Sequence, residues 1–173
     1  MPPYKGQGSP NCAMIEVKPA SNVLIQQPSP SPLLPPAPLP PAIVVHGIDE
    51  LRAALAAAAS LDRSLTVLSI AGAAGSAGAL WFHALIQTGT AEFPQVPLTG
   101  VLDCADQPGH ALAALRAGCR DLLLLESVPA WPRVRAIAEA AGARLHGSFG
   151  PTFDPRFYRD PIGACREWLS VNP

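Results

Sequence analysis

Proline is distributed unevenly along this chain, and that distribution limits where regular structure can form. Of the 21 prolines in 173 residues, twelve fall between Pro2 and Pro41. A proline has no amide hydrogen to donate, and it disfavours the helical conformation in the residue before it. We therefore expect residues 1–41 to be a disordered, proline-rich arm of extended polyproline character that precedes a folded domain.

The rest of the chain has the composition of an ordinary domain. Residues 42–150 are predicted to form one α/β domain, and residues 151–173 a C-terminal extension that packs on it. The formal net charge is −1 and charged residues make up 14%. Because there is no basic surplus, we expect no nucleic-acid partner.

The sequence carries no recognisable export or metal-binding signal. No segment has the length of uninterrupted apolar sequence that a membrane span or a secretory signal needs. The cysteines lack the close spacing of a zinc or dithiol motif, since they lie at positions 12, 104, 119 and 165. We therefore expect a cytoplasmic protein with no membrane span, no bound metal and no cofactor.

Strand patterns and helix patterns alternate from residue 42 onward. Apolar, strand-like runs are predicted at residues 42–45, 65–70, 98–102, 121–125 and 143–146. Helical patterns separate them and follow the last, at about residues 50–59, 77–88, 108–117, 131–141 and 164–169. Such β–α units require parallel pairing and right-handed connections. The sequence therefore predicts a three-layer α/β sandwich with a mostly parallel five-stranded sheet, flavodoxin-like or receiver-like, and a fragment of a (β/α) barrel is the alternative.

Three residues that follow predicted strands are candidates for catalysis. In a parallel sheet all strands end at one edge, where functional groups collect. If the strand order were 2-1-3-4-5, His46 after the first strand and Asp103 after the third would flank one crevice. Cys104 would then be a candidate nucleophile, with His46 as its base. The simpler interpretations are that His46 is a solvated side chain at a strand end and that Cys104 is a small residue of the core.

A second set of residues has the character of a ligand-binding edge. The turn from Ala71 to Gly78 follows a strand and precedes a helix, as a phosphate-binding turn does. Its GxxGxxG spacing differs from the dinucleotide fingerprint and from the P-loop. The candidate ligand-binding residues are Gly72, Gly75, Ser76, Asp106, His110 and Ser127. Local structure alone is the competing explanation, because Asp49, Ser76, Asp106 and Ser127 stand where helix N-caps are expected.

Asp103, with Pro108-Gly109 shortly after it, is similar in outline to a response-regulator receiver domain. In that family an aspartate at the end of the third strand accepts a phosphoryl group. The sequence departs from the family pattern at His46-Gly-Ile-Asp, where an acidic pair is expected, and at His146, where a lysine is expected. The resemblance implies at most a shared fold.

Two functional hypotheses remain open from the sequence. The first is a non-catalytic or regulatory interaction module that binds a protein partner or forms a homo-oligomer, with the aromatic residues of the C-terminal extension as contacts. The second is a small enzyme, or a phosphate or nucleotide binder, that uses the carboxyl edge of the strands. No complete catalytic set is present in the sequence, which favours the interaction module.

Overall fold

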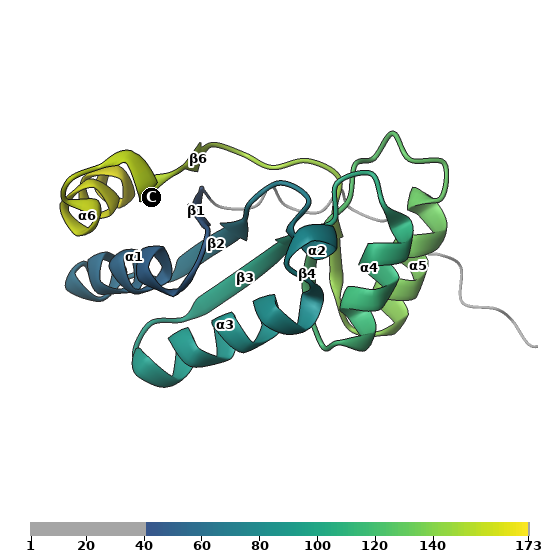
Figure 1. Ribbon diagram of the computed structural model, residues 1–173, viewed down its shortest axis with the longest axis horizontal. Coiled ribbons are helices and arrows are strands. Elements are labelled where there is room, and N and C mark those ends of the chain that lie inside the picture. Colours follow the sequence, from purple (N-terminus) through teal and green to yellow (C-terminus); the bar gives the residue numbers. More distant parts are fainter. Residues whose placement is uncertain (1–40, 173) are drawn as a thin grey trace, which may run out of the picture. The chain divides into compact units, whose positions relative to one another are not determined.

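The computed structural model describes residues 41–172, and these contain one six-stranded sheet. All five strand pairs are parallel, in the order β5-β4-β3-β2-β1-β6. The strands are β1 (Ala42–Val45), β2 (Leu65–Ser69), β3 (Leu98–Asp103), β4 (Asp121–Leu123), β5 (Arg144–His146) and β6 (Thr152–Phe153). The predicted α/β class and parallel pairing are confirmed (Figure 1).

The helices of this part of the chain lie on one face of the sheet. They are α1 (Ile48–Ser60), α2 (Ala73–Ser76), α3 (Ala79–Glu92), α4 (Pro108–Arg116), α5 (Trp131–Ala140) and α6 (Pro161–Val171), with a 3₁₀ turn η1 (Pro155–Phe157). Because β1 to β5 follow one another across the sheet in a single direction, right-handed connections place α1, α3, α4 and α5 on the same side (Figure 1). α6 packs against α1 at the end of this row. Within residues 41–172, no helix forms the third layer of a sandwich.

The prediction of five strands is corrected by the structure, and the strand order 2-1-3-4-5, on which the crevice between His46 and Asp103 depended, does not occur. A sixth strand, β6, pairs with β1 through Ala42↔Thr152 and Ile43↔Phe153. β2 lies between β1 and β3, where the order 2-1-3-4-5 requires β1 and β3 to be neighbours. The observed succession of strands with helices on one side has the connectivity of the barrel fragment that was the alternative prediction.

The short connection between β5 and β6 requires the sheet to curve. These strands form opposite edges, and a flat sheet would separate them by five strand spacings, about 24 Å. Only six Cα steps lead from His146 to Thr152, and a fully extended chain covers roughly 20–22 Å in that length. Residues 147–151 therefore span the face opposite the helices, and the sheet is concave on that side.

The two faces of the sheet bury different amounts of apolar surface. The helix-covered face holds the main core, in which Ile43, Val67 and Leu102 pack with Leu51, Leu55, Phe82 and other helix residues. The concave face holds a separate cluster made of Ala42, Leu68, Val101 and Leu123, with Phe149 packed against it. No helix residue belongs to this second cluster in the described part of the chain.

The residues predicted to be helix N-caps do not cap the helices. Asp49, Ser76, Asp106 and Ser127 are not N-caps, since the helices α1, α3, α4 and α5 begin after Gly47, Gly78, Gln107 and Ala130 without a side-chain cap. Among the helices of residues 41–172, side-chain caps occur only beyond β6, where Asp154 accepts from the Arg156 N–H and Asp160 from the Gly163 N–H. These helices rely on packing of their apolar face against the sheet.

The C-terminal extension is joined to the sheet through β6 and to the helix layer through α6. The predicted arm lies outside the described residues, apart from Pro41. None of the helices in residues 41–172 combines the length and the hydropathy that a membrane crossing requires.

Candidate functional site

At the carboxyl edge of the sheet, the predicted catalytic residues lie in two separate places. His46 follows β1 and Asp103 ends β3, with β2 between them. The crevice expected between these two residues therefore does not form. Each helix returns the chain to the next position in the sheet, which places His46 and Asp103 two strands apart.

Asp103 is a buried carboxylate that holds two turns together. Its Oδ1 accepts the N–H of Gly72 at 3.1 Å and the N–H of Ala105 at 2.7 Å. Both donors have left-handed backbones, with φ of 66° at Gly72 and 50° at Ala105. That conformation costs a non-glycine residue roughly 1 kcal/mol or more, so the Asp103 carboxylate stabilises an otherwise unfavourable turn at Ala105.

The glycine-rich turn after β2 uses its amide groups internally. The N–H of Ala73 donates to Ile70 O at 3.1 Å, and those of Gly75 and Ser76 donate to Gly72 O at 3.0 and 3.2 Å. A phosphate-binding turn instead directs amide hydrogens at its ligand. The Gly72 N–H is bound to Asp103, and the amides of Ala77 and Gly78 donate to Ala73 O, so six amides of this turn have acceptors within the protein.

The turn also packs against α4 through an exposed histidine. A Cβ at Gly75 would lie 2.7 Å from Cε1 of His110, so the glycine permits the imidazole to approach the backbone. The structure thus brings Gly72, Gly75 and Ser76 together with Asp103 and His110.

The remaining predicted ligand-binding residues lie at exposed positions. Asp106 accepts a hydrogen bond from Nε2 of Gln107 at 2.7 Å. Ser127 lies in the loop between β4 and α5.

Cys104 has an environment that opposes nucleophilic chemistry. Its side chain is fully buried, and its Sγ donates to Leu102 O at 3.7 Å. Burial, followed by the neighbouring Asp103 carboxylate, raises the pKa of Cys104 to about 12. The thiolate is the reactive form of cysteine, and this site disfavours it. Cys119 and Cys165 are also buried free thiols.

His46 belongs to a partly exposed cluster between β1 and the segment after β6. Its Nε2 lies 2.9 Å from Oδ2 of Asp154, and its Nδ1 lies 3.3 Å from Nη1 of Arg156. A neutral ring with its proton on Nε2 satisfies both contacts. Burial alone would raise the pKa of Asp154, but hydrogen bonds from the Arg156 N–H and from His46 outweigh it, so the pKa is lowered. We call His46, Asp154 and Arg156 the β1–β6 cluster.

A second cluster of the same residue types lies on the concave face, and it was not predicted. Arg144 makes a two-pronged contact with Asp121, Nε to Oδ1 at 2.5 Å and Nη2 to Oδ2 at 3.0 Å, and His146 Nε2 lies 3.2 Å from the same Oδ1. Asp121 and His146 are each only 7% exposed. Burial by itself would raise the pKa of Asp121, but the hydrogen bonds and charges of His146 and Arg144 together lower it. We call these three residues the β4–β5 cluster.

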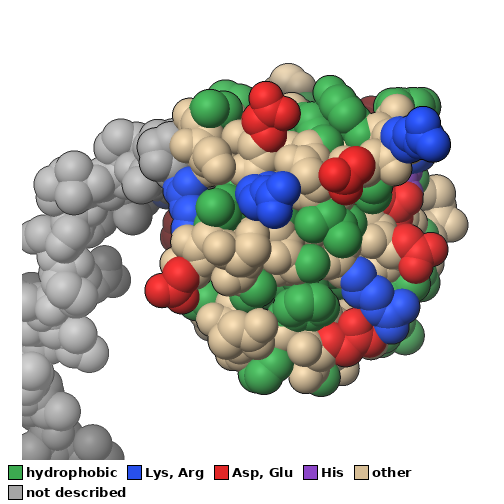
Figure 2. Space-filling model, turned by 90° about the vertical axis from the view of Figure 1, so that its left-hand side faces the viewer, with side chains coloured by type: hydrophobic (Ala, Val, Ile, Leu, Met, Phe, Trp, Pro, Cys, Tyr) green, Lys and Arg blue, Asp and Glu red, His purple; other side chains and the backbone are tan. Residues whose placement is uncertain are grey.

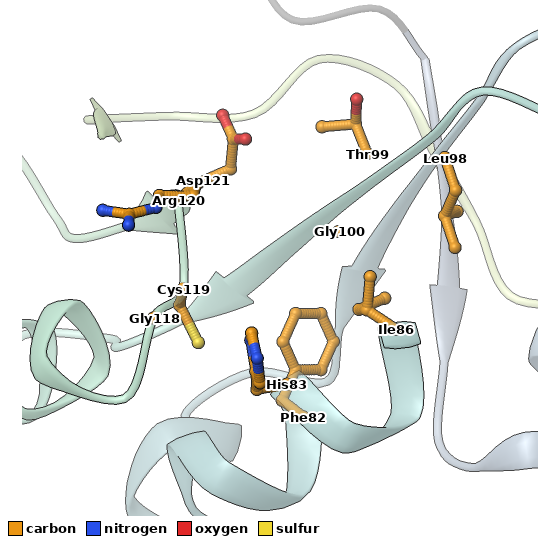
Figure 3. Close-up of a pocket in the computed structure, with 10 residues that line it drawn as sticks. All are labelled: Phe82, His83, Ile86, Leu98, Thr99, Gly100, Gly118, Cys119, Arg120 and Asp121. Atoms are coloured by element: carbon orange, nitrogen blue, oxygen red, sulfur yellow. The ribbon is translucent and has the colours of Figure 1, made fainter. Parts of the chain in front are cut away.

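A cavity of about 210 Å³ lies between α3 and the amino ends of β3 and β4. Figure 3 shows Phe82, His83 and Ile86 of α3 directed toward the strands, with the Cys119 sulfur turned toward His83. Burial raises the pKa of Cys119, so the cavity presents a thiol. The lining is mainly apolar, with His83 as its main polar group on the helix side, so it matches a small apolar molecule rather than a charged one. The lining residues are Phe82, His83, Ile86, Leu98, Thr99, Gly100, Gly118, Cys119, Arg120 and Asp121.

Exposed apolar side chains gather where η1 leads into α6. Phe157 is 79% exposed, and Tyr158 and Ile162 are exposed as well. We call these three residues the aromatic end. Tyr158 rests on Phe153, with ring centroids 5.1 Å apart, and Phe153 in turn stacks on Trp168 at 5.6 Å. Figure 2 shows the side of the molecule that holds α6, where hydrophobic side chains are interspersed with charges of both signs.

A groove of about 570 Å³ runs beside α6 next to the aromatic end. Its lining combines apolar and charged side chains, namely Leu61, Tyr158, Asp160, Gly163, Ala164, Arg166, Glu167 and Ser170.

Within residues 41–172, no group of three or more histidine, cysteine, aspartate or glutamate side chains is arranged to hold a metal ion. The chain matches no model of a known protein family, and no curated protein matches it in sequence.

Proposed function

We propose that this chain is a non-catalytic protein-interaction module, that its contact surface is the aromatic end, and that its partner there is a second copy of the chain. The observation that carries the proposal is the exposure of Phe157 and Tyr158 beside a groove lined by α6. Large aromatic side chains are enriched at protein interfaces because they bury much apolar area with few rotatable bonds.

The chemistry of the strand edge supports a non-catalytic role. The Asp103 carboxylate is occupied by two amides, Cys104 is a buried thiol with a raised pKa, and His46 is two strands away. Nucleophilic catalysis needs a nucleophile within reach of an oriented base.

Two features favour a second copy as the partner. The aromatic end is flanked by Arg156 and Arg166 and by Asp160 and Glu167, so a two-fold arrangement can place opposite charges across the interface. β6 is also the outermost strand on this side of the sheet. An edge strand has unpaired backbone groups that can pair with another chain.

Sedimentation velocity over a concentration series tests this proposal on the full chain. The unmodified protein should form a dimer as concentration rises, and Phe157→Ser should shift the dimer to monomer at every concentration. Leu80→Ser is the matched control, because Leu80 is 73% exposed and lies on α3, outside the aromatic end. A monomer at all concentrations, or equal effects of the two substitutions, would refute the proposal.

A second candidate is an anion-binding role at the edge formed by Gly75, Ser76 and His110. Its support is the exposed imidazole of His110, which lies against Gly75, whereas the amides of the turn have acceptors within the protein and would not contribute. Inorganic phosphate should then raise the melting temperature of the full chain, and His110→Ala should abolish that shift. An unchanged melting temperature would leave the interaction module as the sole candidate.

A further inference from the structure

The helix layer leaves part of an interior strand uncovered. β3 lies between β2 and β4, and interior strands of a parallel sheet are normally buried. Its residues Leu98 and Gly100 face the helices but are only partly buried. α4 ends at Arg116, so a turn, and not a helix, lies beside α3 at this place. The cavity of about 210 Å³ between α3 and the amino ends of β3 and β4 is this opening.

The volume of the cavity fits one aromatic ring with short substituents. An apolar cavity of roughly 150 Å³ holds a benzene molecule. The cavity beside α3 is larger, at about 210 Å³. The additional volume accommodates about two further heavy atoms, since a water molecule takes up roughly 30 Å³.

The two charged residues of the lining direct their charges elsewhere. Figure 3 shows the carboxylate of Asp121 on the opposite side of the strands from Phe82 and His83. That carboxylate is paired with Arg144, and Nη1 of Arg120 donates to Ala141 O at 2.9 Å. An ionic ligand would therefore meet no opposite charge from these two residues, and burial of an unpaired charge is costly. The cavity favours a neutral molecule.

The helix side of the cavity offers an aromatic wall beside one hydrogen-bonding group. Phe82 and His83 of α3 both point toward the strands (Figure 3). The imidazole of His83 lies close to the turn, because a Cβ at Gly118 would be 3.3 Å from its Cε1. Aromatic rings pack well on a phenylalanine and against a cysteine sulfur such as that of Cys119. An imidazole can donate a hydrogen bond to a hydroxyl group or accept one from it.

We propose that this cavity binds a neutral phenol, with a single ring, one hydroxyl group and one small alkyl group. The ring packs on Phe82 and Ile86, and the hydroxyl forms a hydrogen bond with His83. This inference is independent of the interaction proposed for the aromatic end, because neither Phe157 nor Tyr158 lines the cavity.

Methyl NMR spectroscopy of the full chain tests the location, with p-cresol as the probe. The methyl signals of Ile86 and Leu98 should shift and saturate, with a Kd of about 1 mM or lower for a ligand of this size. The methyl signals of Ile162, which is exposed at the aromatic end, should not move. p-Hydroxybenzoate, which carries a negative charge, should give no saturable shift. Shifts at Ile162 instead of Ile86, equal binding of p-hydroxybenzoate, or no saturable shift with p-cresol would each overturn the proposal.

A pair of substitutions tests the hydrogen bond to the ligand. His83→Phe retains a ring but removes the hydrogen-bonding nitrogens, so the affinity for p-cresol should fall about fivefold more than the affinity for toluene, which has no hydroxyl group. Gln87→Phe is the matched control, because Gln87 is an exposed residue of the same helix and lies outside the lining. It should leave both affinities unchanged. If His83→Phe weakens both ligands equally, or if Gln87→Phe has the same effect as His83→Phe, the proposal is wrong.

Discussion

Two clusters in this protein are built from the same three residue types but differ in their exposure to water. In the β4–β5 cluster, the side chains of Asp121 and His146 are 10% and 7% exposed, while that of Arg144 is 61% exposed. In the β1–β6 cluster, the side chains of His46, Asp154 and Arg156 are 20%, 28% and 47% exposed. Water therefore reaches the histidine and the carboxylate of the second cluster more easily than those of the first, while the arginines of both clusters are open to water. We therefore expect burial of the histidine and the carboxylate, rather than the identity of the residues, to decide how much each cluster contributes to stability.

The largest effect is expected from removal of the buried carboxylate. Asp121→Ala should lower the free energy of unfolding by about 2–4 kcal/mol, because it leaves the buried His146 and one side of Arg144 without their acceptor. Urea denaturation measures this loss. A loss no greater than that of Asp154→Ala would show that burial does not separate the two clusters.

The next largest effect is expected in how the stability of the fold depends on pH in acid. The pKa of Asp121 is lower in the folded chain than in the unfolded chain, so its ionised form stabilises the fold above the unfolded value of about 3.9. That stabilisation is lost as the pH falls from about 4 through the folded pKa. Asp121→Asn should therefore give a shallower decline of stability below about pH 4 than the unmodified chain. Unfolding followed by circular dichroism at several acid pH values measures the slope, and parallel curves would contradict the assignment.

Removal of the exposed carboxylate should have a smaller effect. Asp154→Ala breaks the contact with His46 and removes the side-chain cap of η1, for an expected loss of about 1 kcal/mol or less. The same urea experiment measures it. Asp154→Asn is the control, because an amide can still accept the Arg156 N–H and should recover the part of the loss that comes from the cap.

The smallest effect is expected at His46 itself. His46→Gln retains a donor for Asp154 in a partly solvated place, and it should change the free energy of unfolding by less than about 0.5 kcal/mol. His146→Gln, at the buried counterpart, should cost several times more. Comparable values for the two variants would mean that the shared residue types, and not burial, set the energetics.

The course of the chain through its first five strands could be predicted from local patterns. Runs such as Leu65–Ser69 are apolar and short, and the alanine-rich run that follows Asp49 is helical. β6 could not be predicted, because Thr152–Phe153 is two residues long and shows no periodicity. The strand order could not be predicted either. It depends on which edge of β1 pairs with β6, and β6 lies more than a hundred residues further along the chain.

The predicted site was only partly accessible for the same reason. The turn geometry that brings Gly72 and Asp103 together follows from two neighbouring strand ends, which local patterns identify. The partner of His46 lies beyond β6 and so had no local signal. The β4–β5 cluster did leave a trace, because Asp121 begins an apolar strand, and Arg144 and His146 stand two apart in the next strand. Charged residues at same-face positions of buried strands indicate an ion pair across them.

The pairing of β1 with β6 has a consequence for how the chain acquires its structure. β1 to β4 each pair with the strand that comes next along the chain, whereas β6 pairs with β1, so that Ala42 and Thr152 are joined across 110 residues. Closing so long a loop is entropically unfavourable, and contacts of this kind slow folding. During synthesis one edge of β1 stays unpaired until Thr152 and Phe153 have been made. In that interval the apolar run Ile43–Val45 has an unpaired edge that can aggregate with other chains.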